Sequence, residues 1–304
     1  AVLLLAGCAS SAAGPGARSG GSPATPPPTE ALLTAHATLL RLEDRREYDP
    51  ATLGTLAADS SPRIRARTAL ALARLRNPAG ADLLRHLIED PDTSVAATAA
   101  FGLGQLGDSA HARSLVGALA DPDTRPTVAA EAAYALGKVG GADARSALIT
   151  LLAGTPVAPG AAHPVVNSAL LALWKLAPLD DLEPVGRWLQ AADPELRWRA
   201  AYALTRRPAA AALPRLRPLL ADPDPTVRAT AARGMTGPLA ASAGIARESL
   251  VADLIPLTAD TAYAVSINTI RSLGSLATPT AVARLTELAR GGEAHCAWAA
   301  VEAL

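Results

Sequence analysis

Residues 102–107 read GLGQLG and so spell G-x-G-x-x-G, the glycine pattern of dinucleotide-binding loops. Such a loop cradles a pyrophosphate only when a β-strand precedes its first glycine and a helix follows it. A repeated pattern in this chain instead places Gly102 and Gly104 inside a helix, and the copies at 71–73 and 135–137 read ALA and ALG. Alanine and glycine exchange at these positions. We therefore expect them to need small side chains for close helix contacts and not to bind phosphate.

Other residues have the chemistry of metal ligands but not the arrangement. Three aspartate pairs resemble partial calcium sites, yet each lies at a junction between predicted helices, where capping and turns account for it. The pairs are Asp90/Asp92, Asp121/Asp123 and Asp222/Asp224. The five histidines are scattered, and His295-Cys296 lacks a third ligand. No nucleophile motif such as G-x-S-x-G occurs. The sequence thus predicts no metal, no cofactor and no catalytic residue.

The composition favours an all-helical protein. Half of the 304 residues are apolar, only 3% are aromatic, and the net charge is zero. The apolar residues are mainly Ala, Leu and Val; Ala and Leu are strong helix formers, while aromatic strand formers are scarce. A neutral chain lacks the basic surface of a typical nucleic-acid-binding protein. We expect neither a nucleic-acid partner nor a small-molecule substrate.

A frame of apolar and small residues recurs along the chain. Most copies start at an apolar anchor, followed by a small residue at +4 and apolar residues at +8 and +11. Two copies depart from this at +11, where Arg207 and Pro238 stand, and the first copy fits less clearly. After Val95 these are Ala99, Leu103 and Leu106. The anchors are Leu32, Ile64, Val95, Val128, Val165, Leu196, Val227, Val265 and Cys296. Their spacings are 32, 31, 33, 37, 31, 31, 38 and 31 residues, which gives a base period of about 31 residues.

Each copy also carries the start and stop signals of a helical hairpin. A capping residue stands three positions before four of the anchors: Ser61, Asp92, Asp193 and Asp224. The first helix should run for about 13 residues and stop near a Gly, Asn or Pro. A second helix follows, as at residues 79–89 and 112–120. Eight hairpins and a truncated ninth, over residues 30–304, predict an all-α solenoid.

An arginine directly follows the anchor in three copies of the frame. These residues are Arg65, Arg197 and Arg228. We expect them to pair with nearby Asp side chains or to cover helix ends, in a solvated structural role.

The repeat resembles the HEAT repeat, in the short bacterial form of the phycobilisome-lyase-type HEAT-like proteins. The resemblance lies in the D-P-D turn and the V-x-x-x-A-A-x-x-L-G-x-L-G-D run of residues 90–108, and in the copy at 222–235. It covers roughly residues 30–304. It implies the fold but no lyase activity, and most such arrays look like binding scaffolds. We therefore expect a non-catalytic scaffold that recruits a protein or peptide partner.

The start of the chain resembles the lipobox of bacterial lipoproteins. Residues 5–8 read LAGC after a short apolar run that is typical of the end of a signal peptide. The resemblance implies that Cys8 is lipidated and becomes the mature N-terminus. Residues 9–29 are rich in Ser, Gly, Ala and Pro, as in a disordered tether. We expect residues 1–8 to end a signal peptide, and a lipid anchor to hold the array on the extracytoplasmic side of a bacterial cell envelope.

The rare aromatic residues gather in consecutive copies of the frame. Six of them are candidates for contact with the partner, because Trp and Tyr are favoured at binding hot spots. They are Phe101, Tyr134, Trp174, Trp188, Trp198 and Tyr202. The alternative is that these rings fill gaps in the Ala-rich core and beside the irregular loop before Val165.

A different function is compatible with the same array. Residues 39–50, LLRLEDRREYDP, are similar to the start of bacterial lipoproteins that join a HEAT array to a cyclophilin-type prolyl isomerase domain. This resemblance implies a larger enzyme whose array recruits substrates, with the isomerase domain after Leu304. None of the catalytic residues of such a domain stand in this sequence. A third interpretation is a cytoplasmic array with an apolar start unrelated to lipidation.

Globomycin, which inhibits lipoprotein signal peptidase, should change the electrophoretic mobility of the protein in cells, because cleavage before Cys8 would be blocked. The measurement is an immunoblot of treated and untreated cells. A Cys8→Ala variant is the control, and its mobility should not respond to the drug. Unchanged mobility of the wild type in treated cells would contradict the lipoprotein interpretation.

Overall fold

The computed structural model describes residues 30–120, 125–157, 164–176, 181–206 and 209–304. Within these ranges every regular element is helical and no β-strand occurs. The predicted lipidation site at Cys8, the tether at 9–29 and the pair Asp121/Asp123 lie outside the described residues. The all-α prediction is therefore confirmed for the part of the chain that carries the repeat.

Two sets of helices alternate along the chain. The first helices of the hairpins are α1 (Glu30–Arg45), α3 (Pro62–Leu75), α5 (Thr93–Leu106), α7 (Pro126–Val139), α9 (Pro164–Leu173), α11 (Pro194–Arg206), α13 (Pro225–Gly234), α16 (Tyr263–Leu276) and α18 (Ala294–Ala303). The second helices are α2 (Pro50–Ala57), α4 (Ala81–Leu87), α6 (Ala112–Ala118), α8 (Gly141–Gly154), α10 (Glu183–Gly186), α12 (Ala212–Leu216), α14 (Gly237–Ser242), α15 (Arg247–Leu254) and α17 (Pro279–Gly291). Short 3-10 turns accompany the second helices: η1 (Pro78–Gly80), η2 (Ser109–His111), η3 (Arg187–Gln190), η4 (Arg217–Ala221) and η5 (Ile255–Ala259).

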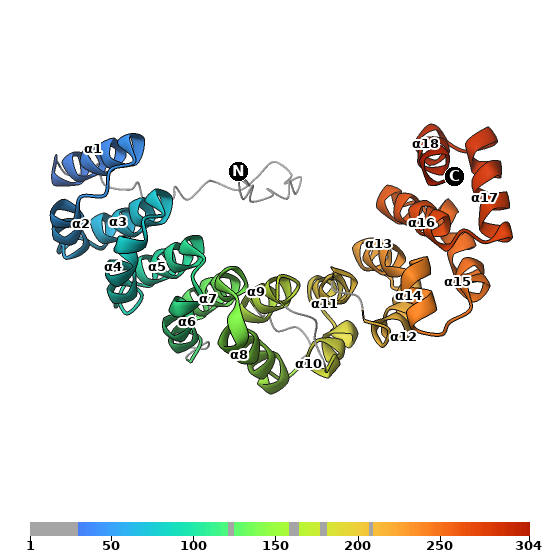
Figure 1. Ribbon diagram of the computed structural model, residues 1–304, viewed down its shortest axis with the longest axis horizontal. Helices are drawn as coiled ribbons and strands as arrows, with labels where there is room; N and C mark the ends of the chain where they lie inside the picture. Colours follow the sequence, from blue (N-terminus) through green and yellow to red (C-terminus); the bar gives the residue numbers. More distant parts are fainter. Residues whose placement is uncertain (1–29, 121–124, 158–163, 177–180, 207–208) are drawn as a thin grey trace, which may run out of the picture.

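The hairpins stack side by side into an open arc (Figure 1). Each first helix contacts the first helix of the next hairpin, from α1 through α18. These helices line the inner, concave side of the arc, and the second helices form its outer, convex side. Such a stack is an α-solenoid, in which each hairpin buries its apolar face against its neighbours.

The frame predicts the buried side of the first helices. From α3 onward, the small residue at +4 is buried in every copy: Thr68, Ala99, Ala132, Ala169, Ala200, Ala231, Thr269 and Ala300. The first copy is wrong by one residue. In α1 the buried residues are Ala35, Leu39 and Leu42, whereas Leu40 is 55% exposed. These three positions match +4, +8 and +11 of an anchor at Ala31. The anchor predicted at the apolar Leu32 is therefore one residue too late.

The second helices are shorter than the sequence predicts. The helix expected over 79–89 is α4, which spans only Ala81–Leu87 and is preceded by η1. The Asn77 side chain accepts from the Ala79 N–H at 3.0 Å, and this contact starts the tighter 3-10 turn. The long spacing between the anchors Val227 and Val265 has a separate cause, because two helices, α14 and α15, stand where other hairpins have one.

Aspartate caps fix the starts of several first helices. Asp92 accepts from the N–H groups of Ser94 and Val95 at 2.9 and 3.2 Å, and Asp224 does the same for α13. Asp193 accepts from the Glu195 N–H at 2.9 Å. Ser61 occupies the predicted cap position of α3, but its side chain makes no capping hydrogen bond. The cap prediction is thus confirmed for the aspartates and wrong for the serine.

The arginines after the anchors tie neighbouring hairpins together. Arg65 donates to both carboxylate oxygens of Asp90 at 2.6 and 2.9 Å, and to the carbonyls of Asp59 and Ser60. The Arg65 guanidinium thereby holds the pKa of Asp90 below its ordinary value. The same clamp recurs in two further copies, as Arg197 with Asp222 and Arg228 with Asp260.

The predicted pairing of these arginines is confirmed, but their predicted solvation is wrong. The Arg65 and Asp90 side chains are only 16% and 7% exposed. Each clamp spans the loop before a first helix and the turn before the next one, so it is partly enclosed by both. A charge pair that has given up this much water depends on its bidentate geometry.

Glycines allow consecutive first helices to touch at their backbones. A Cβ added to Gly104 of α5 would lie 2.8 Å from Ala135 Cβ and 3.0 Å from its Cα, on α7. A Cβ on Gly137 of α7 would lie 2.7 Å from Ala172 Cβ on α9. Both contacts join position +9 of one frame to +7 of the next. A Cβ on Gly102 would lie 2.7 Å from Leu84 Cδ2, so the close-packing prediction is confirmed for Gly102 and Gly104.

Gly104→Ala should lower the free energy of unfolding by about 1–3 kcal/mol, because α5 and α7 must separate to admit the methyl group. Gly54→Ala is the matched control, since nothing lies within 4 Å of its added Cβ in α2. It should stabilise the protein by up to about 1 kcal/mol. Urea unfolding followed by circular dichroism measures both. Equal effects of the two substitutions would contradict the close-packing role of Gly104.

Candidate functional site

Five of the six aromatic residues predicted to bind a partner come together on the concave surface. Phe101 lies on α5, Tyr134 on α7, Trp174 directly after α9, and Trp198 and Tyr202 on α11. The rings of Trp174 and Tyr202 meet edge to face, with centroids 6.3 Å apart, and those of Trp198 and Tyr202 meet likewise at 6.2 Å. Edge-to-face contacts are a preferred geometry for aromatic pairs. The array thus gathers residues from four successive hairpins.

Cationic side chains lie over these rings. Lys138 Nζ is 5.0 Å from the ring centroids of both Phe101 and Tyr134. Lys175 Nζ is 4.5 Å from the centroid of Tyr134 and 5.9 Å from that of Trp174. At these distances an ammonium group is attracted by the ring quadrupole. Rings and ammonium groups therefore alternate from α5 to α9.

The alternation continues onto α11. The guanidinium carbon of Arg206 lies 4.8 Å from the Trp174 ring centroid and 5.8 Å from that of Tyr202. Arg199 covers the Trp198 ring at 4.5 Å. We call these five rings, with Lys138, Lys175, Arg199 and Arg206, the cation–aromatic ridge. It runs across the first helices of four hairpins.

The sequence carries a signal for these cations. Lys138, Lys175 and Arg206 all stand at position +10 of their frames, one helical turn after the +6 position of Tyr134 and Tyr202. Lys138 and Lys175 are also the only lysines of the chain. Comparing the +10 residues across copies, as was done for the aromatic +6 residues, would have predicted the ridge.

The two lysines are half-buried cations. Burial lowers the pKa of both, and repulsion from Lys175 lowers that of Lys138 further, while Glu131 opposes this shift. Within the part of the chain that the structure describes, Lys138, Lys175 and Arg206 form no ion pair. Arg74, at the same +10 position on α3, differs in this respect because it pairs with Glu43 at 3.0 Å. Three cations without an ion pair among the described residues thus lie along the ridge, from α7 to the end of α11.

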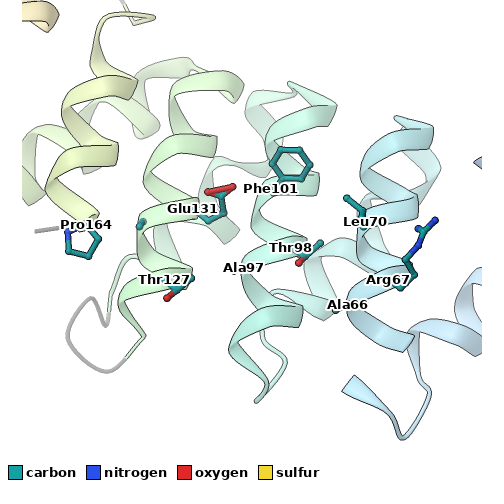
Figure 2. Close-up of a pocket in the computed structure, with 10 residues that line it drawn as sticks. Ala66, Arg67, Leu70, Ala97, Thr98, Phe101, Thr127, Glu131 and Pro164 are labelled. Carbon is teal, nitrogen blue, oxygen red and sulfur yellow. The ribbon is translucent and has the colours of Figure 1, made fainter. Parts of the chain in front are cut away.

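An open groove of about 670 Å³ adjoins the ridge and crosses α3, α5 and α7 (Figure 2). Phe101 belongs to both the groove and the ridge. Glu131 lines one side, and burial raises its pKa against the opposing effect of Lys138. On the opposite side Arg67 is bound to Glu43 through Nη1, while its buried Nη2 has no hydrogen-bond partner. The groove therefore has an apolar floor between one cationic and one carboxyl wall.

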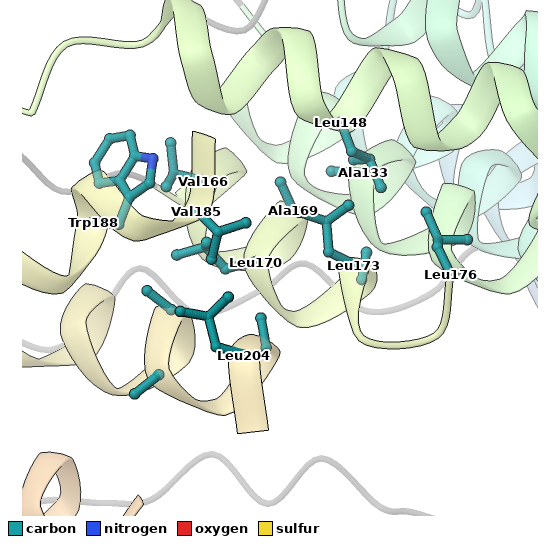
Figure 3. Close-up of a cluster of buried hydrophobic side chains, with 14 of the residues drawn as sticks. Ala133, Leu148, Val166, Ala169, Leu170, Leu173, Leu176, Val185, Trp188 and Leu204 are labelled. Atoms are coloured by element: carbon teal, nitrogen blue, oxygen red, sulfur yellow. The ribbon is translucent and has the colours of Figure 1, made fainter. Parts of the chain in front are cut away.

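The sixth predicted residue, Trp188, lies in the core and must be removed from the binding set. Its side chain is fully buried, and its indole N–H donates to the Leu152 carbonyl at 3.3 Å. Figure 3 shows it beside Val166 and Val185. For this ring the gap-filling alternative is confirmed. The sequence grouped Trp188 with Trp174 because both belong to the same hairpin. Trp188, however, lies in the second half of that hairpin, on the side that packs against α8.

Other chemical candidates remain apart. No three His, Cys, Asp or Glu side chains gather as a metal site among the described residues. Cys296 is buried and unpaired in this part of the chain, and His295 lies 3.6 Å from Glu293 and against the Tyr263 ring. No described helix combines the length and apolarity needed to cross a bilayer.

The sequence profile of HEAT repeats matches residues 86–162 and 182–237. The structure is similar to that of the Escherichia coli protein YibA, with 15% identity and a TM-score of 0.57; the match covers 88% of this chain and 96% of that one. The chain therefore carries HEAT repeats at residues 86–162 and 182–237. An engineered protein gives 19% identity and a TM-score of 0.53 over 88% and 83% of the two chains. These likenesses establish the fold of the HEAT array.

A third similar structure is the CpcE–CpcF complex of phycocyanin lyase from Nostoc sp. PCC7120, at 21% identity and a TM-score of 0.49 over 79% of this chain and 93% of that one. At that level the likeness carries no argument about activity. No curated protein matches the sequence.

Trp188→Ala should lower the free energy of unfolding by about 3–5 kcal/mol, because it removes a fully buried ring from the core. Trp198→Ala should cost less than about 1 kcal/mol and leave helicity unchanged, since this ring is only half-buried. Thermal unfolding followed by circular dichroism compares them. If Trp198→Ala lowers the free energy of unfolding as much as Trp188→Ala does, Trp198 is a packing residue and does not belong to the binding surface.

Proposed function

We propose that this HEAT array is a non-catalytic scaffold that binds a protein or peptide partner along its concave surface. The observation that carries the proposal is the cation–aromatic ridge. Its rings and cations come from four hairpins, face the same side and are held in position by the stacking of the first helices. Half-buried Trp, Tyr and Arg side chains are the residues that most often dominate protein interfaces.

The concave position of the ridge supports binding of an elongated ligand. A solenoid offers one continuous inner surface, and a segment lying along it contacts equivalent positions in successive repeats. The groove at Phe101 and Glu131 extends this surface beyond the ridge toward α3. A ligand spanning both would touch five successive first helices, from α3 to α11.

We further propose that a lipid on Cys8 holds the array at the extracytoplasmic face of a bacterial membrane. The lipobox-like LAGC at residues 5–8 and the tether composition of residues 9–29 support this placement. A lipid anchor with a short tether would leave the concave surface free to meet a partner near the membrane.

Tyr134→Ala/Tyr202→Ala should reduce capture of the partner at least tenfold, because two ridge rings are lost. The full-length chain is used as bait in an extract of the organism that encodes it, and a captured protein is purified and titrated against each variant. Tyr263→Ala/Trp298→Ala is the matched control, since it removes two exposed rings away from the ridge.

The control should retain the partner as the wild type does. Two results would count against the scaffold proposal: equal loss in both double variants, or no protein retained by the wild type above bare resin. Circular dichroism of each variant confirms that the array is folded.

A further inference from the structure

We infer that the ridge recognises an acidic peptide segment in extended conformation, with carboxylates at about every third residue. This inference rests on the proposed function, because it names the chemistry of the partner that the scaffold would bind. It is carried by the register of three cations on successive helices, together with unpartnered polar atoms on the same surface.

The positive charge of the ridge indicates that the partner segment is negatively charged. Lys138 lies on α7, Lys175 in the turn after α9 and Arg206 at the end of α11, and none has an ion pair among the described residues. A lysine that has lost part of its hydration gains more from an approaching carboxylate than a fully solvated one. Glu131 is the acid that acts electrostatically on Lys138, and burial raises its pKa, which disfavours its charged form.

Geometry determines the spacing of the partner's carboxylates. Packed helices lie roughly 8–10 Å apart, and an extended chain advances about 3.3 Å per residue. Equivalent positions on consecutive first helices are therefore about three residues apart along an extended peptide. One carboxylate at every third position would meet each cation in turn, while the residues between them contact the half-buried rings.

Unpartnered buried atoms independently mark the same surface. Among the described residues, five buried side-chain nitrogen or oxygen atoms have no hydrogen-bond partner. Three of the five belong to concave positions +2 or +3 of first helices: Arg67 Nη2, Asn167 Oδ1 and Arg199 Nε. Two of these three are donors, and Asn167 can accept. Such groups are costly unless something binds them, and a peptide backbone offers both carbonyls and N–H groups.

A single-stranded nucleic acid is also anionic, but the rings do not suit it. Stacking of bases requires open ring faces. Here ammonium or guanidinium groups lie over Phe101, Tyr134, Trp174 and Trp198 at 4.5–5.0 Å, so a face of each is already covered. The zero net charge of the chain adds no general attraction for phosphates. The ridge therefore suits carboxylates held on a peptide better than stacked bases.

The test measures fluorescence anisotropy of a labelled peptide of about twelve residues, long enough to span four hairpins. The peptide carries Glu at every third position, with Ser, Thr and Ala between. Two comparison peptides have the same Glu residues gathered at one end, or Gln in their place. The protein is the full chain, as wild type, Lys138→Met/Lys175→Met, or the control Arg113→Met/Arg290→Met, whose arginines are exposed on second helices.

The wild type and the control should bind the spaced Glu peptide, and the lysine double variant should bind it about tenfold more weakly. The gathered Glu peptide should bind several-fold more weakly than the spaced one, and the Gln peptide should not saturate. Added salt should weaken binding of the spaced peptide. Circular dichroism confirms that all variants are folded.

Three outcomes would overturn the inference. These are absence of saturable binding of the spaced peptide, equal affinity of the lysine variant, and tighter ridge-dependent binding of oligothymidylate. The capture experiment separates this failure from failure of the proposed function. Suppose that capture of the partner depends on Tyr134 and Tyr202, but that the bound segment contains no carboxylates. The scaffold proposal would then hold, and only the inference of an acidic peptide would be wrong.

Discussion

The contact between consecutive first helices is the constraint on which the rest of the HEAT array depends. Gly104 against Ala135 and Gly137 against Ala172 bring α5, α7 and α9 together at their backbones. No larger side chain fits at these seams, so the helices have one separation and one register. That register places the +6 and +10 side chains of successive hairpins side by side. The ridge is a consequence of small residues that do not belong to it.

The arginine clamps act on the loops as the glycines act on the helices. Each clamp binds two carbonyls of the loop before its own helix and the carboxylate at the turn before the next one. Arg197, for example, binds the carbonyls of Ala191 and Ala192 and the carboxylate of Asp222. Apolar stacking alone tolerates small rotations between hairpins, whereas a bidentate ion pair has a preferred direction. The two together define how each hairpin sits on its neighbour.

Most of the fold could be predicted from the sequence, because a helix whose one face is buried must repeat its apolar residues at helical spacing. The anchors and the +4 residues followed directly. The frame failed at α1, where Leu32 and Leu40 offered an apolar match one residue away from the buried set. Pattern alone cannot tell a buried leucine of α1 from an exposed one, since among the described residues only one first helix, α3, packs against it.

The candidate site was predicted in part. Rarity and shared +6 spacing identified the rings of α5, α7 and α11, because spacing within a helix fixes which face a residue occupies. Spacing could not show that Trp188 is buried, because its position depends on how the second helix of its hairpin is rotated against α8. The cations of the ridge did not follow from the zero net charge of the chain, nor from the arginines at +1 of the frame, because the ridge cations on three of the helices stand at +10.

One seam differs from its neighbours. Where α5 and α7 present Gly104 and Gly137, the equivalent +9 residue after α9 is Trp174, whose ring reaches Tyr202 and Arg206 on α11. Two helices joined through an aromatic ring can roll and slide in ways that two backbones in contact cannot. We therefore expect the seam between α9 and α11 to be more compliant than the seams at Gly104 and Gly137. A ligand lying across Trp174 would then restrict the movement of these two helices.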